Sequence, residues 1–156
     1  MPRIKKSIYD RPVIGWREWA AFPDLGVTAI NAKIDTGAKT SAIHAFHIRE
    51  TDVEGVPHVS FRLHPVQRRK KPEIACCVPI ADRRTITSSN GQKQDRFVIV
   101  TRLTMGERTW PIELTLTDRD EMGFRLLIGR EALKKRFLID ASGSYRLGHR
   151  HPMEGY

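Results

Sequence analysis

The amino-acid sequence predicts an all-β barrel with one short helix near its C-terminal end, and three observations support this fold class. Short segments of alternating apolar and polar residues run through most of the chain, as expected for half-buried strands. Turn-forming residues separate these segments, and only one segment has the composition of a helix. The length of 156 residues suits one domain covering the whole chain, with flexible ends at residues 1–10 and 149–156.

The predicted strands are short and follow one another closely. Asn90-Gly91 is the strongest hairpin signal in the chain, and further turns are predicted at Glu54-Gly55 and around Gly106. Residues 130–136 consist of good helix formers with a basic end, which predicts the single helix. In chain order, the strand segments are residues 14–19, 29–35, 42–48, 58–63, 74–80, 85–87, 96–100, 110–116, 124–129 and 137–140.

The chain is strongly basic, with a formal net charge of +9 and a pI of about 10.0. This balance favours an anionic partner, such as nucleic acid, a membrane surface or an acidic peptide, without choosing among them. Two neighbouring cysteines, Cys76 and Cys77, can hardly satisfy disulfide geometry, which suits a reducing compartment. The sequence has neither a signal-peptide pattern nor an apolar run long enough to span a membrane, so we expect a cytoplasmic protein.

Asp35 is the first candidate for chemistry, because it ends a predicted strand and is followed by Thr36, Gly37 and Ala38. Glycine lets the backbone turn tightly and approach a ligand. A carboxylate held at a strand end suits general acid–base chemistry, and a threonine hydroxyl can lock the turn. Aspartate is also a common turn residue, so this tripeptide alone does not define a site.

A second element, later in the chain, strengthens the interpretation of Asp35. The apolar strand at residues 124–129 ends in Ile128 and Gly129, and Arg130 opens the predicted helix. An Asp-Thr-Gly tripeptide followed by an apolar strand, a glycine and a helix beginning with arginine resembles the framework of retropepsin-like aspartic peptidases. The hairpin turn at residues 88–91 lies between the two elements, where that family has its flap.

Residues 32–45 resemble one bacterial group within this fold, whose members are labelled ATP-dependent zinc proteases and are often found beside ATP-grasp glutamate ligases. The resemblance implies a peptidase that works as a symmetric homodimer, because one chain supplies only one of the two carboxylates. Two Asp35 side chains would then meet at the twofold axis and activate a water molecule. It also implies that the Gly37 carbonyl is free to hold substrate backbone.

The resemblance assigns roles to individual residues. It implies catalytic roles for Asp35, Thr36 and Gly37, substrate-binding roles for Ala38, Lys39, Ser89, Asn90 and Gly91, and structural roles for Ile128, Gly129 and Arg130.

Lys39 departs from the family pattern, because retropepsins usually have an acidic residue or asparagine there, which pairs with the helix arginine. The partner of Arg130 is therefore left open. A lysine at this position, together with Arg83 or Arg84 near the flap, would suit acidic side chains. We therefore expect an acidic or glutamate-rich peptide substrate.

The two cofactors in the group's label have no clear sequence signal. Gly37-Ala38-Lys39-Thr40 resembles the end of a phosphate-binding loop but lacks its preceding glycines. His44 and His47 would face opposite sides of a strand, and a catalytic zinc ion needs about three ligands. We expect no cofactor and no metal.

Two other functions remain open. A basic module on a peptidase-like barrel could bind nucleic acid or the ribosome, although no RNA-reading motif is present and the aromatic residues do not interleave with the basic runs. A zinc-dependent hydrolase is the other alternative. Trp16, Trp19 and Trp110 are interpreted as core or dimer-interface residues.

Overall fold

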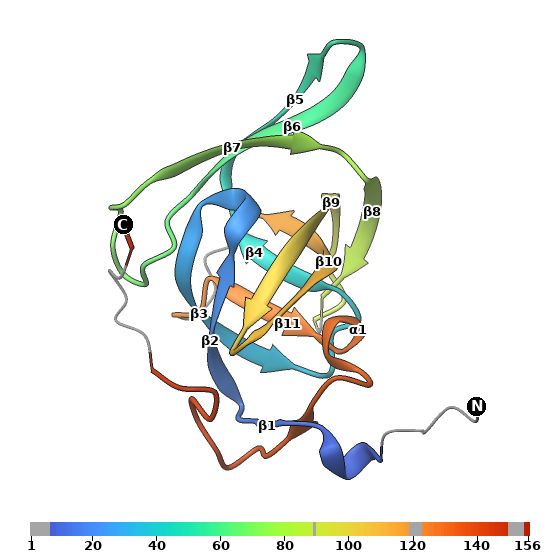
Figure 1. Ribbon diagram of the computed structural model, residues 1–156. Helices are drawn as coiled ribbons and strands as arrows, with labels where there is room; N and C mark the ends of the chain where they lie inside the picture. Colours follow the sequence, from blue (N-terminus) through green and yellow to red (C-terminus); the bar gives the residue numbers. More distant parts are fainter. Residues whose placement is uncertain (1–6, 89, 119–122, 150–154) are drawn as a thin grey trace, which may run out of the picture.

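The computed structural model describes residues 7–88, 90–118, 123–149 and 155–156. The predicted all-β class is confirmed, with a single short α-helix in the described residues (Figure 1). The elements are η1 (Ile8–Asp10), β1 (Val13–Ile14), β2 (Arg17–Phe22), η2 (Pro23–Leu25), β3 (Val27–Asp35), β4 (Ser41–His44), β5 (Phe46–Val53), β6 (Val56–Leu63), β7 (Ile74–Pro79), β8 (Asp82–Thr87), β9 (Lys93–Met105), β10 (Arg108–Thr117), β11 (Leu126–Gly129), α1 (Arg130–Leu133) and β12 (Leu138–Ile139).

The main sheet has seven strands in the order β10-β4-β11-β3-β2-β9-β8, and β9 also pairs with β10, so that the sheet closes into a barrel. Strand β11 lies between β3 and β4, parallel to the first and antiparallel to the second. This arrangement brings the end of β11 beside the end of β3, with Gly129 directly opposite Asp35. The fold therefore joins the two sequence elements that resemble a retropepsin site.

A second sheet, β5-β6-β7, stands at one end of the barrel, and its β5–β6 hairpin projects away from the body of the molecule (Figure 1). The hairpin turns at Glu54 and Gly55, as predicted, and both residues have positive φ, 53° and 83°. Strand β7 pairs with β6 from Leu63↔Ile74 to His58↔Pro79.

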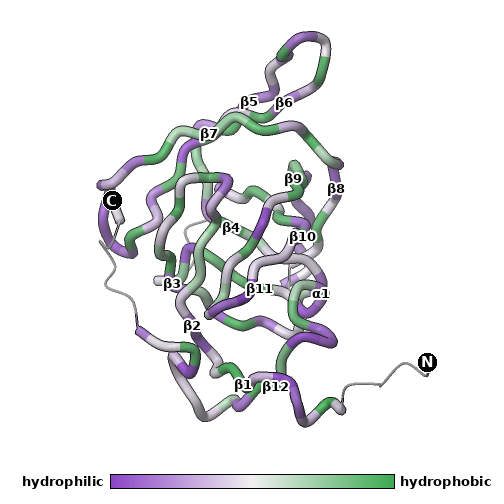
Figure 2. The backbone as a smooth tube through the Cα atoms, in the orientation of Figure 1, coloured by the Kyte–Doolittle hydropathy of each residue, from purple (hydrophilic) through white to green (hydrophobic). Residues whose placement is uncertain are grey.

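The hydrophobic core fills the barrel. Its fully buried side chains come from nearly every barrel strand, and each contributes roughly 1.5–3 kcal/mol through burial. Figure 2 shows apolar residues along the barrel strands and a mixture of apolar and polar residues in the projecting hairpin. Ile14 of β1 and two residues of β6 join the barrel side chains in this core. The largest fully buried side chains are Phe22, Phe61, Ile14, Ile30, Ile43, Leu63, Ile99, Leu103, Met105, Leu114, Leu126 and Ile128.

Two segments predicted as single strands are each divided in the structure. Residues 14–19 form the end of β1 and the start of β2, because the chain turns at Gly15, where a Cβ would overlap the Gly143 carbonyl. Residues 42–48 are interrupted at Ala45, a fully buried residue at which the chain leaves the barrel for the second sheet. Both breaks result from contacts with distant segments. Such contacts cannot be predicted from the alternation of apolar and polar residues.

The helix is shorter than the predicted segment 130–136 and covers only Arg130–Leu133. The C-cap residue Lys134 leaves the helical conformation with ψ of 140°, and Lys135 follows in a left-handed conformation with φ of 64°. The turn returns Phe137 to the core, where its ring lies 5.6 Å from that of Trp110. Tertiary burial of Phe137 thus overrides local helix propensity.

The C-terminal residue is not frayed, although a flexible tail is predicted there. The hydroxyl of Tyr156 accepts hydrogen bonds from the backbone N–H groups of Thr28 and Ala29 at 3.0 and 3.2 Å, and donates one to the Ala29 carbonyl. Residues 1–6 and 150–154 lie outside the described residues. Within the described ranges, no helix is long and apolar enough to cross a membrane.

Candidate active site

The candidate site begins at Asp35, the last residue of β3, which is half-buried. Its Oδ1 accepts a hydrogen bond from the Gly37 N–H at 3.1 Å, and its carbonyl accepts one from the Ala38 N–H at 3.2 Å. A Cβ at Gly37 would lie 3.3 Å from the Asp35 carboxylate, tighter than an ordinary contact. The predicted tight turn is therefore present, and it fixes one oxygen of the Asp35 carboxylate.

Gly129 lies opposite Asp35 and holds the loop that follows it. A Cβ at this position would come within 2.8 Å of the Lys39 carbonyl oxygen and 2.9 Å of the Ala38 carbonyl oxygen. The Gly129 N–H donates to the Oγ of buried Ser41 at 3.1 Å. A glycine is required here because the backbone of the loop crosses the end of β11 directly.

The start of α1 closes the same loop from the other side. The N–H of Arg130 donates to the Ala38 carbonyl at 2.8 Å, and that of Glu131 donates to the Lys39 carbonyl at 3.1 Å. The Arg130 guanidinium donates to the Gly37 carbonyl at 3.2 Å and lies 3.5 Å from that of Thr36. The partner that the sequence left open is therefore the loop backbone.

This contact corrects the expectation of a free Gly37 carbonyl. One of its acceptor positions is used by Arg130 in the single chain, because Lys39 cannot accept the arginine's hydrogen bonds as an acidic residue would. A substrate would have to use the remaining lone pair of this oxygen or displace the arginine.

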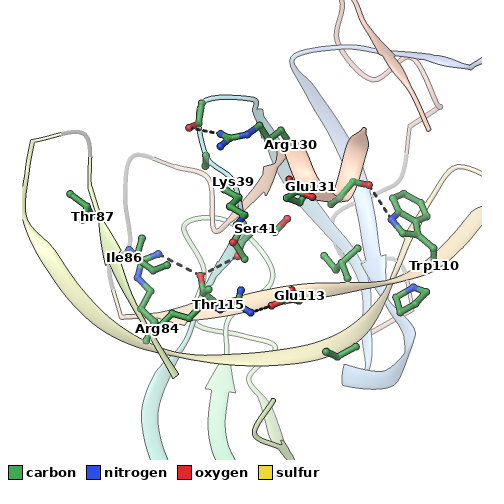
Figure 3. A pocket seen from close by; sticks show the side chains of 18 of the residues that line it. Lys39, Ser41, Arg84, Ile86, Thr87, Trp110, Glu113, Thr115, Arg130 and Glu131 are labelled. Atoms are coloured by element: carbon green, nitrogen blue, oxygen red, sulfur yellow. Dashed lines mark hydrogen bonds and ion pairs between the residues drawn. The ribbon is translucent and has the colours of Figure 1, made fainter. Parts of the chain in front are cut away.

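A cavity of about 1000 Å³ lies between this loop, the β8 arm of the β8–β9 hairpin, β10 and α1 (Figure 3). Its volume is at the upper end of ordinary ligand pockets. In Figure 3, Lys39 and Arg130 lie on one wall, Arg84, Ile86 and Thr87 on the facing hairpin, and Trp110 at the far side.

The predicted site residues that the structure describes divide into two groups. Gly37, Ala38, Lys39 and Arg130 line the cavity. Ser89 lies outside the described residues. The predicted site residues that do not line it in the single chain are Asp35, Thr36, Asn90, Gly91, Ile128 and Gly129.

The hairpin contributes its arm to the cavity, in place of the predicted turn residues. The Asn90 side-chain oxygen accepts from the Gln92 N–H at 3.2 Å and from the Ser88 hydroxyl, so it stabilises its own turn. Gly91 has φ of 82°, as a hairpin turn requires. The cavity is lined instead by Arg84–Thr87 of β8 and by Arg96 of β9.

Sequence reasoning missed three further residues of the site. Ser41 holds Gly129 and also accepts the Thr115 hydroxyl on its carbonyl at 3.1 Å. Trp110 is 5% exposed, as expected for a core residue, yet it also lines the cavity together with Arg136. The only available signal was the alternation of β10, which places Trp110 on the inward face but cannot show what lies above it.

The cavity is predominantly cationic. Arg84 hydrogen-bonds Asp82 at 2.7 Å and also pairs with Glu113, and these contacts raise the pKa of its guanidinium. A hydrogen bond from Lys134 is the main cause that lowers the pKa of Glu131, with smaller effects of Lys39 and Arg130. The charged lining residues are Lys39, Arg84, Arg96, Arg130 and Arg136 against Glu113 and Glu131.

Arg83, the other arginine predicted to lie near the flap, does not face the cavity. Its guanidinium pairs with Glu50 of β5 and lies 5.5 Å from the ring centroid of Phe97. It is not part of the cavity lining. Of the two arginines proposed near the flap, only Arg84 is therefore positioned to face a ligand.

The described residues contain no group of three or more histidine, cysteine, aspartate or glutamate side chains placed to hold a metal ion. The ring of His44 stacks near that of Phe46, at 6.4 Å between centroids, and His47 is exposed. Cys76 is half-buried and Cys77 is exposed, and both are free thiols. Burial raises the pKa of the Cys76 thiol to about 11, so it stays neutral.

A closed barrel in which a strand ending in glycine is inserted beside an Asp-Thr-Gly turn defines a retropepsin-like domain. The chain belongs to the RimB-like family, described as retropepsin-like aspartic endopeptidase RimB, whose sequence profile matches residues 13–149. This result confirms the resemblance at the level of the retropepsin-like family.

Curated relatives have a different name. A protein of Shewanella pealeana, called probable alpha-L-glutamate ligase, is 49% identical over 142 residues, which are 91% of this chain and 31% of that protein. A protein of Desulfotalea psychrophila with the same name is 45% identical over 138 residues, 88% of this chain and 30% of that protein. The chain thus spans about a third of the length of these relatives, and their names do not mention a zinc protease.

A solved structure supports the fold. A Legionella pneumophila protein of unknown function superimposes with a TM-score of 0.68 at 23% identity, covering 87% of this chain and 98% of that one. At this identity the similarity concerns the architecture alone.

Proposed function

We propose that this chain is one half of an aspartic peptidase, and that two copies bring their Asp35 carboxylates together across a twofold axis. The observation that carries the proposal is the pairing of Gly129 with Asp35, combined with the turn that fixes the Asp35 carboxylate. Family membership supports the same activity. One carboxylate per chain makes a second copy necessary, since the reaction needs two.

In this dimer the two carboxylates share one proton, because two charges so close cannot both form easily. The ionised carboxylate removes a proton from the bound water, whose oxygen attacks the peptide carbonyl carbon. The protonated carboxylate gives its proton to the carbonyl oxygen. These two steps convert the peptide carbonyl into a gem-diol intermediate. When this intermediate collapses, the C–N bond breaks, and proton transfer to the nitrogen releases an amine and a carboxylic acid.

The proposed substrate is an acidic peptide, including glutamate-rich tails. The cavity lining holds five cationic residues and two carboxylates, which favours anionic side chains. The relatives named as glutamate ligases add a second reason, because such an enzyme makes the type of chain that this cavity would accept. Lys39, on the cavity wall beside Asp35, is proposed to contact the substrate.

Asp35→Asn tests the peptidase directly. We expect it to abolish cleavage of an oligoglutamate peptide, measured by mass spectrometry, while circular dichroism and the sedimentation coefficient stay unchanged. Asp52→Asn, on the exposed β5–β6 hairpin, removes the same charge and should cleave normally. Undiminished cleavage by Asp35→Asn would exclude the proposed mechanism.

A second candidate is a domain that binds acidic peptides without cleaving them and serves glutamate ligation. The names of the longer relatives favour it, since this chain matches about a third of each of them. If the chain is such a binding domain, the unmodified chain should bind the peptide and release no cleavage products at any pH tested. Binding of nucleic acid that weakens with salt and survives Asp35→Asn would instead support the basic-module alternative.

A further inference from the structure

The far end of the cavity, away from the Asp35 loop, contains an arginine stacked on an aromatic ring. The guanidinium carbon of Arg136 lies 4.9 Å from the centroid of the Trp110 ring. Both residues line the same cavity as Gly37 and Lys39. In Figure 3, Trp110 and Thr87 lie on opposite sides of the view.

The Trp110 ring is held in a fixed orientation. Its indole N–H donates to the Ala132 carbonyl of α1 at 3.1 Å, and Phe137 packs against it. The Arg136 carbonyl in turn accepts a hydrogen bond from the Arg108 guanidinium at 3.3 Å. These contacts position a guanidinium over a buried ring, and stacking leaves the N–H groups at its edge available for another ligand.

Arg136 also lacks a carboxylate partner among the residues that the structure describes, and its side chain is exposed. The two acidic residues of the cavity are already paired. Glu113 pairs with Arg84, and Glu131 pairs with Lys134 at 2.6 Å. The positive charge of Arg136 is therefore uncompensated inside a cavity whose own carboxylates are occupied.

We infer that Arg136, stacked on Trp110, is a specificity-determining residue that binds a carboxylate side chain of the peptide, at a subsite remote from the cleaved bond. A planar guanidinium can form two parallel hydrogen bonds with one carboxylate, which a neutral amide cannot replace in full. The subsite distinguishes glutamate from glutamine at one position of the substrate. This inference rests on the proposed peptidase function for its substrate, but its test does not require cleavage.

The test measures binding in the Asp35→Asn background, so that no peptide is consumed. A fluorescently labelled oligoglutamate peptide and its oligoglutamine counterpart are titrated at low salt and followed by fluorescence anisotropy. We expect Arg136→Gln to weaken binding of the glutamate peptide about tenfold. The affinity for the glutamine peptide should not change.

Lys135→Gln is the matched control, because it removes the same charge from the neighbouring residue, which does not line the cavity. Near-normal affinity of this variant would support a local subsite. An equal loss in both variants would overturn the inference in favour of a general charge effect, and so would an Arg136→Gln variant that binds the glutamate peptide normally. If the unmodified chain cleaves nothing while Arg136→Gln alone binds weakly, the subsite stands and the peptidase proposal fails.

Discussion

The two walls of the cavity are stabilised in different ways. The loop wall, formed by residues 37–41 and the start of α1, is fixed by backbone hydrogen bonds and by the direct contact of Gly129 with the loop. The hairpin wall, formed by β8, is held by ladder pairing with β9 and by side-chain ion pairs such as Arg84–Glu113, which joins β8 to β10. A wall that positions a carboxylate must be rigid, whereas a wall that covers a substrate must be able to move.

The first prediction places a methyl group against the loop wall, at Gly129, and another in the turn of the hairpin, at Gly91. Gly129→Ala should lower the free energy of unfolding by about 3 kcal/mol, because the new Cβ meets two backbone carbonyls of the loop. Gly91→Ala should lower it by only about 1 kcal/mol, because the cost is limited to its positive φ and no atom lies within 4 Å of the new Cβ. Urea denaturation measures both values, and equal losses would contradict the proposed difference in rigidity.

The second prediction removes one hydroxyl from each wall. Ser41→Ala leaves the buried Gly129 N–H without its acceptor and should lower the free energy of unfolding by about 2 kcal/mol. Thr85→Ala removes an exposed hydrogen bond to Asp95 and should change it by less than about 0.5 kcal/mol. Amide hydrogen exchange at Gly129 should also accelerate in Ser41→Ala alone. Unchanged protection there would show that Ser41 does not hold the loop.

The same difference explains what could be predicted from the sequence. The Asp35 turn and Gly129 could be recognised because each depends on a local backbone requirement that restricts the residue type. Strands such as β6 could be predicted from the alternation of apolar and polar residues alone. In each of these cases the determining residues lie close together in the chain, so that the pattern is visible before folding.

Contacts between distant segments could not be predicted. Glu18 is a polar residue in a strand, yet it is fully buried and its carboxylate accepts the backbone N–H groups of Gly15, Arg146 and Leu147 at 2.7–3.0 Å. The cavity wall formed by Trp110 and Arg136 depends in the same way on the turn at Lys135. Such residues acquire their roles only when the C-terminal segment packs on the barrel.

The smallest predicted effect concerns the ion pairs of the hairpin wall. Hydrogen bonding to Arg84 is the main cause that lowers the pKa of Asp82 below its ordinary 3.8, and the Arg83 N–H adds to it. Because the folded-state pKa is depressed, the pair stabilises the fold above pH 3.8, and this stabilisation disappears as the pH falls through the lowered value. The Arg84 and Asp82 side chains are 35% and 48% exposed, so the contribution is small and is screened by salt.

Arg84→Gln should therefore unfold slightly more easily than the unmodified chain at pH 7, and the difference should vanish in acid. Thermal unfolding followed between pH 7 and pH 2 at low ionic strength measures it. Arg102→Gln, which breaks an exposed pair with Asp24 outside the cavity, provides the control, since hydrogen bonding to Arg102 lowers the pKa of Asp24 in the same way. Both variants should lose a similar amount of thermal stability. Only Arg84→Gln should alter binding of an acidic peptide, because Arg84 lines the cavity and Arg102 does not. A pH-independent difference for Arg84→Gln would show that the ion pairs of Arg84 do not contribute to the stability of the fold.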